Sequence, residues 1–348
     1  MLESIELKNF MGFPEIAVEL SPGINIFIGE NGVGKTNFLK AAYGLCSAGP
    51  LLSCHPNWDT KTLEDELTRK FVRLFLPLDD KLGNMHHTGA KGVASLTARF
   101  ANDQEITAVF TKKSDKIEIK HSEDLHTLAE SPVFVPSKEV LSFMLGFASL
   151  YDKYEISFDQ TYKDICMLLD HPKIRKENLS LEAQNAINEI EKISQGIFQF
   201  YGGGRVTFKT EKEEYSANAV GEGIRKIGIL ARLLKTGAIQ PGVSGPLFWD
   251  EPDSNLNPQM MNLLVNILYS LAKNGQQIIL ATHDYVLLKW FEMIADDKQK
   301  IYFYSMYNNN KNICISKTDE YINLEHNSID DTYDELIDYY ITKNKMLS

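Results

Sequence analysis

Residues 29–36 have the types and spacing of a loop that binds nucleotide phosphates. They fit the pattern G-x-x-x-x-G-K-[ST], in which glycines let backbone N–H groups turn toward phosphate oxygens. Lys35 is expected to reach the β- and γ-phosphates and to assist catalysis, and the Thr36 hydroxyl is expected to hold Mg²⁺. The predicted nucleotide contacts are Gly29, Glu30, Asn31, Gly32, Val33, Gly34, Lys35, Thr36 and Asn37.

The segments on either side of this phosphate loop must position it. Residues 24–28 are apolar apart from Asn25, which indicates a buried strand, and residues 37–45 have the composition of a helix. A helix that begins at the loop adds its partial positive charge to the phosphate site. A glycine-rich turn without function would not require either element.

Two adjacent carboxylates, Asp250 and Glu251, follow the apolar run 247–249. In open α/β sheets, ligands bind at the carboxyl ends of the strands. Asp250 is therefore predicted to hold Mg²⁺ together with Thr36, and Glu251 to orient or deprotonate the attacking water. An ordinary acidic turn is the alternative, and the phosphate loop elsewhere in the chain makes it the weaker one.

A second apolar run, 278–280, ends in Thr282, His283 and Asp284. One helix separates this run from Asp250, so the two runs are expected to be neighbouring parallel strands. His283 would then reach the γ-phosphate or hold the water and Glu251 in register, which makes it a predicted catalytic residue.

Taken together, these segments resemble the heads of ABC-type ATPases. Residues 254–258 are similar to the D-loop of that superfamily, and His283 is similar to its H-loop. Residues 5–10 and 22–32 are similar to the SMC/RecF/OLD branch, and residues 135–139 to a segment of OLD-like ATPases. The resemblance covers both ends of the chain and leaves most of 50–210 unmatched.

The resemblance implies an α/β P-loop NTPase fold of the ABC-head type. It has a mixed, largely parallel core sheet, an antiparallel β subdomain and a helical insertion. ATP and Mg²⁺ are the implied cofactors. We expect an N-terminal lobe at 1–139, a helical insertion at 140–204 and a C-terminal lobe at 205–348.

In this superfamily two heads sandwich two ATP molecules, and a signature loop of one head contacts the nucleotide of the other. The predicted counterpart is the signature-like segment, residues 221–226. The implied contacts are Gly221, Gly223, Arg225 and, from the D-loop segment, Asn255. The family's serine is absent, and Glu222 would bring a carboxylate near the γ-phosphate unless Arg225 or Lys226 offsets it. A plain helix cap is the alternative. No glutamine loop is identifiable, although Ser137 or Glu139 could substitute.

The remaining patterns outline the elements. Strands are predicted within 2–28 and at 71–76, 93–100, 105–110, 116–120 and 133–135, and a loop at 49–59. Residues 140–200 show a helical pattern, with a stripe at Ala186, Ile190, Ile193 and Ile197 that favours a packed insertion over a coiled-coil arm. Helix 258–273, a hairpin at 301–306 and 313–316 around Asn308–Asn310, and a terminal helix through Tyr333 and Ile341 complete the chain.

Composition bounds the function classes. The chain of 348 residues has 43% hydrophobic and 24% charged residues, which is ordinary for a soluble protein. It shows no apolar run of membrane-span length and no signal peptide, so we expect a cytoplasmic protein without a membrane partner.

Neither metal sites nor a broadly basic surface is indicated. The four scattered cysteines indicate buried thiols in preference to metal sites, and His86 with His87 is predicted to be a surface pair. The net charge of −11 argues against a broadly basic surface but leaves nucleic-acid contact open at short basic runs near 69–73, 112–113 and 173–176.

The leading hypothesis is an OLD-like, SMC/RecF-related ATPase that dimerises around ATP and drives or gates a DNA-directed effector in defence or repair. About 65 residues follow His283, too few for the nuclease domain of OLD proteins, so a nuclease would be a separate protein. The alternatives are a transporter ATPase subunit and a nucleotide-gated scaffold with little turnover.

Overall fold

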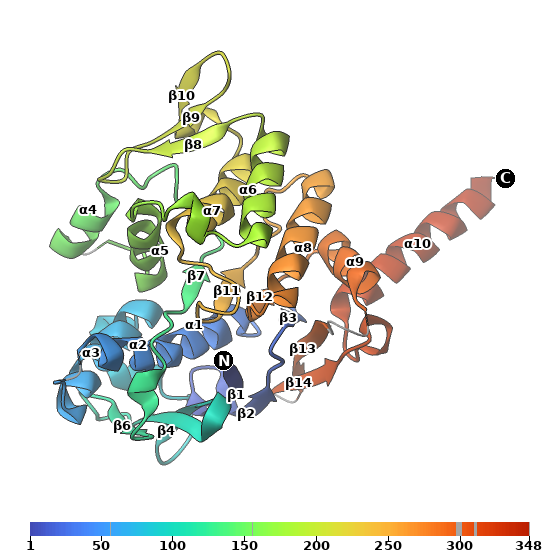
Figure 1. Ribbon diagram of the computed structural model, residues 1–348. Coiled ribbons are helices and arrows are strands. Elements are labelled where there is room, and N and C mark those ends of the chain that lie inside the picture. Colours follow the sequence, from blue (N-terminus) through green and yellow to red (C-terminus); the bar gives the residue numbers. More distant parts are fainter. Residues whose placement is uncertain (56, 155, 297–300, 310–311, 348) are drawn as a thin grey trace.

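Three sheets organise the chain in the computed structural model, which describes residues 1–348 apart from 56, 155, 297–300, 310–311 and 348 (Figure 1). A six-stranded core sheet has the order β14-β13-β3-β12-β11-β7, and a five-stranded sheet has the order β2-β1-β4-β5-β6. A small sheet, β10-β9-β8, lies at the other end of the molecule from the five-stranded sheet.

The core sheet brings the chemistry-bearing loops to one edge. Its parallel strands are β3 (Ile24–Gly29), β7 (Val133–Val135), β11 (Leu247–Asp250), β12 (Ile278–Ala281) and β13 (Ile301–Asn309), and β14 (Asn312–Thr318) pairs antiparallel with β13. Asp250 lies beside Ala281, and Ala281 lies beside Phe27. The loops after β3, β11 and β12 therefore leave the sheet side by side, as the apolar runs predicted.

One face of the core sheet packs against α1 (Lys35–Cys46), which lies between it and the five-stranded antiparallel sheet. That sheet consists of β1 (Leu2–Phe10), β2 (Phe13–Glu19), β4 (Ala94–Phe100), β5 (Gln104–Phe110) and β6 (Glu118–His121). The Phe27 ring of β3 stacks on Tyr304 and contacts Phe38 of α1, with ring centroids 4.5 and 4.7 Å apart. This aromatic layer anchors the helix that begins at the phosphate loop.

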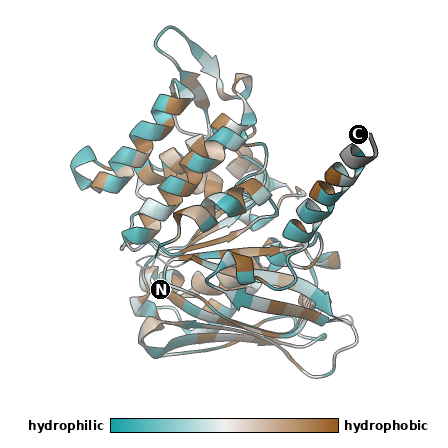
Figure 2. Ribbon diagram, turned by 90° about the vertical axis from the view of Figure 1, so that its right-hand side faces the viewer, coloured by the Kyte–Doolittle hydropathy of each residue, from teal (hydrophilic) through white to brown (hydrophobic). Residues whose placement is uncertain are grey.

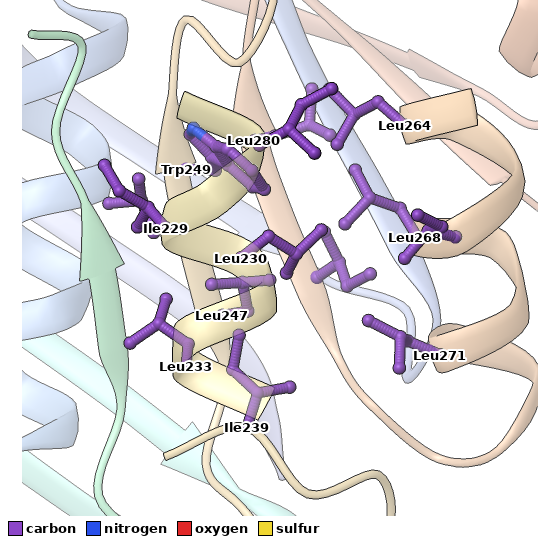
Figure 3. Packing of buried hydrophobic residues seen from close by; sticks show 14 of the residues in the cluster. Ile229, Leu230, Leu233, Ile239, Leu247, Trp249, Leu264, Leu268, Leu271 and Leu280 are labelled. Carbon is purple, nitrogen blue, oxygen red and sulfur yellow. The ribbon is translucent and has the colours of Figure 1, made fainter. Parts of the chain in front are cut away.

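Helices cover the opposite face of the core sheet. They are α5 (Gln160–Asp170), α6 (Leu181–Ser194), α7 (Glu222–Thr236), α8 (Pro258–Lys273) and α9 (Tyr285–Ile294). Figure 3 shows α7 and α8 side by side, with Leu230 of α7 among leucines that include Leu268 and, from β11, Leu247. Successive residues of each parallel strand alternate between the two cores, so the strands are buried on both faces.

The remaining elements lie around this centre. They are α2 (Ala48–Cys54), α3 (Thr60–Phe75), α4 (Phe147–Lys153), β8 (Ile197–Phe200), β9 (Val206–Lys209), β10 (Glu214–Ser216) and α10 (Ser328–Leu347). In Figure 2, α10 extends away from the body. Its predicted apolar face, including Tyr333 and Leu336, is exposed. Among the described residues, no helix is both long and apolar enough to cross a membrane.

Several predictions in the N-terminal half are wrong. His86, predicted as part of a surface pair, is buried at 6% exposure, and Cys54, predicted as a buried thiol, is exposed. Residues 71–76, predicted as a strand, belong mainly to α3, because Asp59 caps that helix and its buried residues recur at helical spacing from Leu63 to Leu74. Residues 49–59 are not all loop, since α2 runs to Cys54. Pro50 is tolerated there because the first N–H groups of a helix need no intrahelical partner.

The helical prediction for 140–200 holds only in part. Ala186 and Ile190 are buried, but Ile193 is 42% exposed and α6 ends at Ser194. Gln195 adopts the left-handed conformation, and Ile197 then starts β8, which pairs with β9. The remaining predicted strands and the helix at 258–273 are confirmed. The hairpin is confirmed too, although Asn310 lies outside the described residues. The three-part division of the chain stays a prediction.

Leu230 should be among the most costly residues to truncate. It is fully buried between α7, α8 and the core sheet, so we expect Leu230→Ala to lower the free energy of unfolding by about 2–5 kcal/mol in urea titrations. The matched control is Leu336→Ala on the exposed face of α10, which should change it by less than about 0.5 kcal/mol. Equal effects would contradict the packing.

Candidate functional site

The phosphate loop connects β3 to α1, and its conformation depends on glycine. Gly29 has φ = 142°, and a Cβ there would lie 2.1 Å from the carbonyl oxygen of Met306. Lys35 is buried, and its Nζ donates to the carbonyl oxygens of Gly29 and Glu30 at 2.6 and 3.1 Å. Burial lowers the pKa of Lys35, while Asp250 and Glu251 raise it. The Lys35 ammonium group is therefore held against the backbone of the phosphate loop.

The predicted metal ligands meet across the chain. Thr36 Oγ1 donates to both carboxylate oxygens of Asp250, at 2.9 and 3.1 Å, over a separation of 214 residues. Asp250 is only 6% exposed, and burial raises its pKa to about 6, although the Thr36 hydrogen bond opposes that shift. A buried carboxylate whose contact is a neutral hydroxyl is incompletely compensated, so this pair fits a divalent cation.

Glu251 and His283 are also brought together. Glu251 adopts φ = 48°, and its N–H donates to the carbonyl of Ala281 at 2.9 Å, which ties the end of β11 to β12. His283 Nδ1 lies 3.6 Å from Glu251 Oε1, and the two side chains are 49% and 35% exposed. Both groups therefore face solvent next to the buried Asp250, where water and a phosphate group can reach them.

The D-loop segment, residues 254–258, follows directly. Asp253, just before it, is buried and accepts a 2.5 Å hydrogen bond from the hydroxyl of Thr282, and burial raises the pKa of Asp253. Asn255 has φ = 60° and donates to the Glu222 carboxylate at 2.9 Å. The signature-like segment of this chain is thus bonded to its own D-loop segment.

That contact depends on Gly223. A Cβ at this position would lie 2.8 Å from the carbonyl oxygen of Asn255, so only glycine lets α7 approach the D-loop segment this closely. Gly221 forms the N-cap of α7 without a side-chain hydrogen bond.

Lys226 connects α7 to two loops at the centre of the site, the loop after β7 and the loop between β11 and α8. It is 1% exposed, and its Nζ donates to the carbonyl oxygens of Ser137 and Glu251 and to the hydroxyl of Ser254. Burial lowers its pKa to about 8, against the pull of nearby carboxylates that include Asp253 and Glu251. The first turn of α7 is therefore bonded to the backbone that carries Glu251.

Arg225 is committed within the chain as well. Its Nη2 lies 2.8 Å from the Glu139 carboxylate, and both side chains are largely buried. Its Nη1 donates to the carbonyl of Val220. Sequence reasoning assigned Arg225 to a nucleotide and Glu139 to a substitute glutamine loop, and the structure brings these two side chains to each other.

The sequence did not predict a second group of contacts, which lies between α1 and α5. Lys40 pairs with Asp159 at 2.7 Å, and Tyr43 donates to Asp164 at 2.6 Å, which joins α1 to the N-terminal half of α5. The spacing of Lys40, one helical turn after Thr36, was the available signal. Its partner could not be predicted, because Asp159 lies 119 residues further along the chain and belongs to no motif recognised in the sequence.

Neutralising Asp250 should stabilise the protein in the absence of ligands. Because the folded-state pKa of about 6 exceeds the ordinary value of about 3.9, ionisation costs the fold nothing at low pH and about 3 kcal/mol above pH 6. Asp250→Asn should therefore raise the free energy of unfolding at pH 7.5 in metal-free buffer, by up to that amount. The gain should nearly vanish at pH 4. A loss of stability at pH 7.5 would contradict the assignment.

Comparisons with known proteins agree with this geometry. Residues 55–289 match the family described as "AAA domain, putative AbiEii toxin, Type IV TA system", and residues 4–43 match a second AAA-domain family. An ATP/GTP phosphatase of Helicobacter pylori is 22% identical over 390 residues, covering 100% of both chains. A DNA replication and repair protein RecF of Clostridium perfringens is 29% identical over 135 residues, which cover 38% of this chain. The matched region spans 35% of that RecF protein.

Solved structures show the same architecture. The SMC head bound to the C-winged helix domain of ScpA superposes with a TM-score of 0.59 at 14% identity, covering 91% of this chain and 97% of that one. The SMC head domain from Thermotoga maritima superposes with a TM-score of 0.50 at 14% identity, covering 91% and 98%. Since the first family match spans well over half of the residues, the chain belongs to this AAA-domain family, and its fold is that of the SMC head domains.

Proposed function

We propose that this chain catalyses Mg²⁺-dependent hydrolysis of ATP and that two copies close around the nucleotides. The observation that carries the proposal is the Thr36–Asp250 pair beside Lys35 and Glu251. These side chains come from the two ends of the chain and meet where a nucleotide bound to the phosphate loop would present its terminal phosphates. The full-length match to an ATP/GTP phosphatase supports the same activity.

Each side chain has a distinct role. Thr36 and Asp250 would hold Mg²⁺, which neutralises charge on the phosphates when it is bound. Lys35 would leave its two backbone carbonyl partners and bind phosphate oxygens. Among the described residues there is no group of three or more His, Cys, Asp or Glu side chains that could hold a metal.

Glu251 is the proposed general base. It would accept a proton from water as the water oxygen bonds to the γ-phosphorus and the bond to the bridging oxygen breaks, which yields ADP and phosphate. His283 would orient the carboxylate, since its Nδ1 lies 3.6 Å away. The partial exposure of both side chains leaves room for the water and for the substrate.

The signature-like segment is the proposed contact to the nucleotide of a second copy. Gly221 and Gly223 open α7, and N–H groups at a helix start suit a phosphate. Glu222 is held by Asn255, which draws its negative charge toward the D-loop segment. We propose that Asn255 exchanges this contact for the partner copy when the dimer closes.

A DNA-directed effector would use the energy of this cycle. The proposal rests on the similarity to RecF proteins, which are named for DNA replication and repair. The net charge of −11 makes broad DNA binding by this chain itself unfavourable, so a separate effector protein, a nuclease among the options, would supply the main DNA contact.

A nucleotide-gated scaffold with little turnover is the second candidate. The observation that favours it is the commitment of Arg225 to Glu139 and of Lys226 to backbone carbonyls. Neither cation is then free to offset Glu222 at the γ-phosphate of a partner copy. Absence of Mg²⁺-dependent phosphate release by the wild type, with and without DNA, would select the scaffold.

Glu251→Gln should separate binding from hydrolysis. Glutamine keeps the size of the side chain but cannot accept the proton, so we expect phosphate release from ATP or GTP to fall at least about a hundredfold. Nucleotide affinity should remain within about threefold, and an ATP-bound dimer should accumulate, as measured by light scattering. The matched control is Glu211→Gln on the exposed β9–β10 turn, which should behave as wild type. Unchanged turnover in Glu251→Gln would refute the general base.

Lys226→Met should lower kcat more than it changes KM. The lysine holds the carbonyl of Glu251 and the hydroxyl of Ser254, and it has no hydrogen bond to the phosphate loop that would bind ATP. We expect kcat to fall about tenfold or more, with KM for ATP within about threefold. Lys235→Met, on the same helix but paired with Glu191, is the matched control. A rise in KM with constant kcat would show that Lys226 acts on binding.

A further inference from the structure

A cavity of about 570 Å³ lies outside the proposed hydrolytic site, on the back of α1. Its walls come from α1, α2, α3, α5 and the residues just before β7. Tyr43 of α1 and Pro132 before β7 both line it, so the cavity borders two elements of the nucleotide-binding core. Its volume falls in the range of sites for small ligands.

Positive charge gathers in this cavity although the chain as a whole is acidic. Arg69, Lys70, Arg73 and Lys163 line it, against two carboxylates, Glu66 and Asp164. No other carboxylate lines the cavity in the described part of the chain, and the net charge of the protein is −11. A local excess of cations in such a protein marks a place where an anion is attracted.

These cations are only partly satisfied by the protein. Arg69 pairs with Glu66 at 2.8 Å while remaining 57% exposed, and Lys163 pairs with Asp152. Among the described residues no carboxylate forms an ion pair with Arg73, and its guanidinium lies 5.7 Å from the centre of the Tyr151 ring. The guanidinium groups of Arg69 and Arg73 are therefore available for bidentate contact with a phosphate.

One acceptor atom next to the hydrogen bonds of Asp164 has no donor. Asp164 receives Tyr43 Oη at 2.6 Å, Gln160 Nε2 at 2.7 Å and Lys70 Nζ at 3.1 Å. The opposite amide atom, Gln160 Oε1, is buried and has no partner among the described residues. Buried polar atoms are normally satisfied, so this oxygen calls for a donor such as an amino group.

We propose that this cavity is a second binding site, which takes a small phosphorylated ligand of the nucleotide class. The cations would bind the phosphate, and Gln160, which lines the cavity, would turn its unpartnered oxygen toward an amino group of the ligand. His55, on the rim, is stacked on Trp58 at 4.2 Å between ring centroids, which adds an aromatic surface. A long nucleic acid fits less well, because the other basic runs, 112–113 and 173–176, do not line the cavity.

Ligand binding here would reach the hydrolytic site through α1. A phosphate would compete with Asp164 for Lys70, and Asp164 is also the partner of Tyr43. One turn earlier in α1, Lys40 is bonded to Asp159, the N-cap residue of α5. The phosphate loop and the cavity are therefore joined by the same pair of helices.

The test uses the full chain carrying Lys35→Ala, which weakens nucleotide binding at the phosphate loop. Sodium pyrophosphate and AMP are titrated separately by calorimetry and by thermal shift. Both should bind with dissociation constants near or below about 1 mM. Adding Arg73→Gln and Lys163→Gln should weaken this binding at least about tenfold. Adding Lys112→Gln and Lys113→Gln, which removes the same charge elsewhere, should leave it unchanged.

The outcomes separate the sources of phosphate. Tighter binding of AMP than of pyrophosphate supports a nucleotide ligand, and comparable binding supports a site for phosphate groups in general. No binding, or equal binding by the two charge-neutralised proteins, overturns the proposal. A 5′-phosphorylated oligonucleotide that binds at least about tenfold more tightly than AMP also overturns it, in favour of a nucleic-acid interface. Circular dichroism of each variant excludes misfolding as the cause of a lost signal.

Discussion

The hydrogen bonds between Thr36 and Asp250 are the contact on which the rest of the site depends. They join residues 214 positions apart, and they form only because β3, β12 and β11 are adjacent parallel strands that end at one edge. This arrangement leaves the Asp250 carboxylate only 6% exposed, and burial raises its pKa. A fold optimised for stability alone would not keep that group ionised. The core packing on both faces of the sheet must therefore compensate for the charge, and an arriving cation would relieve it.

A series of polar contacts connects the loop after Asp250 to the start of α7. Glu251 turns out of the strand at positive φ, and its carbonyl is bound by the buried ammonium of Lys226. Lys226 also reaches Ser254, beyond which Asn255 holds Glu222 at the start of α7. A displacement of α7 would therefore move Lys226 and change how the backbone of Glu251, the proposed base, is held. Lys226 need not contact the nucleotide for this to happen. Rigid packing of α7 against α8 and the core sheet makes such a displacement a movement of the whole helix.

The sequence was informative wherever chemistry is written in adjacent residues. The phosphate loop, the Asp250–Glu251 pair and His283 each follow a recognisable strand, so the structure brings them to one edge as expected. It was uninformative where the partner of a side chain lies far away in the sequence. Glu139 pairs with Arg225, and Asp159 with Lys40, through contacts that no local pattern encodes. The error at 71–76 has another cause, since a short run with two phenylalanines and a valine resembles a strand until the cap at Asp59 and the buried Leu63 and Leu67 are included.

These contacts also hold the signature-like segment, which lacks the serine of the superfamily. A serine in place of Gly221 would bring a hydroxyl to the start of α7, whereas this chain has only backbone N–H groups there. Glu222 would repel a phosphate, but its hydrogen bond to Asn255 holds it within its own chain. If a second copy binds this segment as proposed, Asn255 would first have to release Glu222. Since Ser254, the neighbour of Asn255, is held by Lys226, the same buried cation that supports Glu251 also restrains the surface through which a second copy would bind.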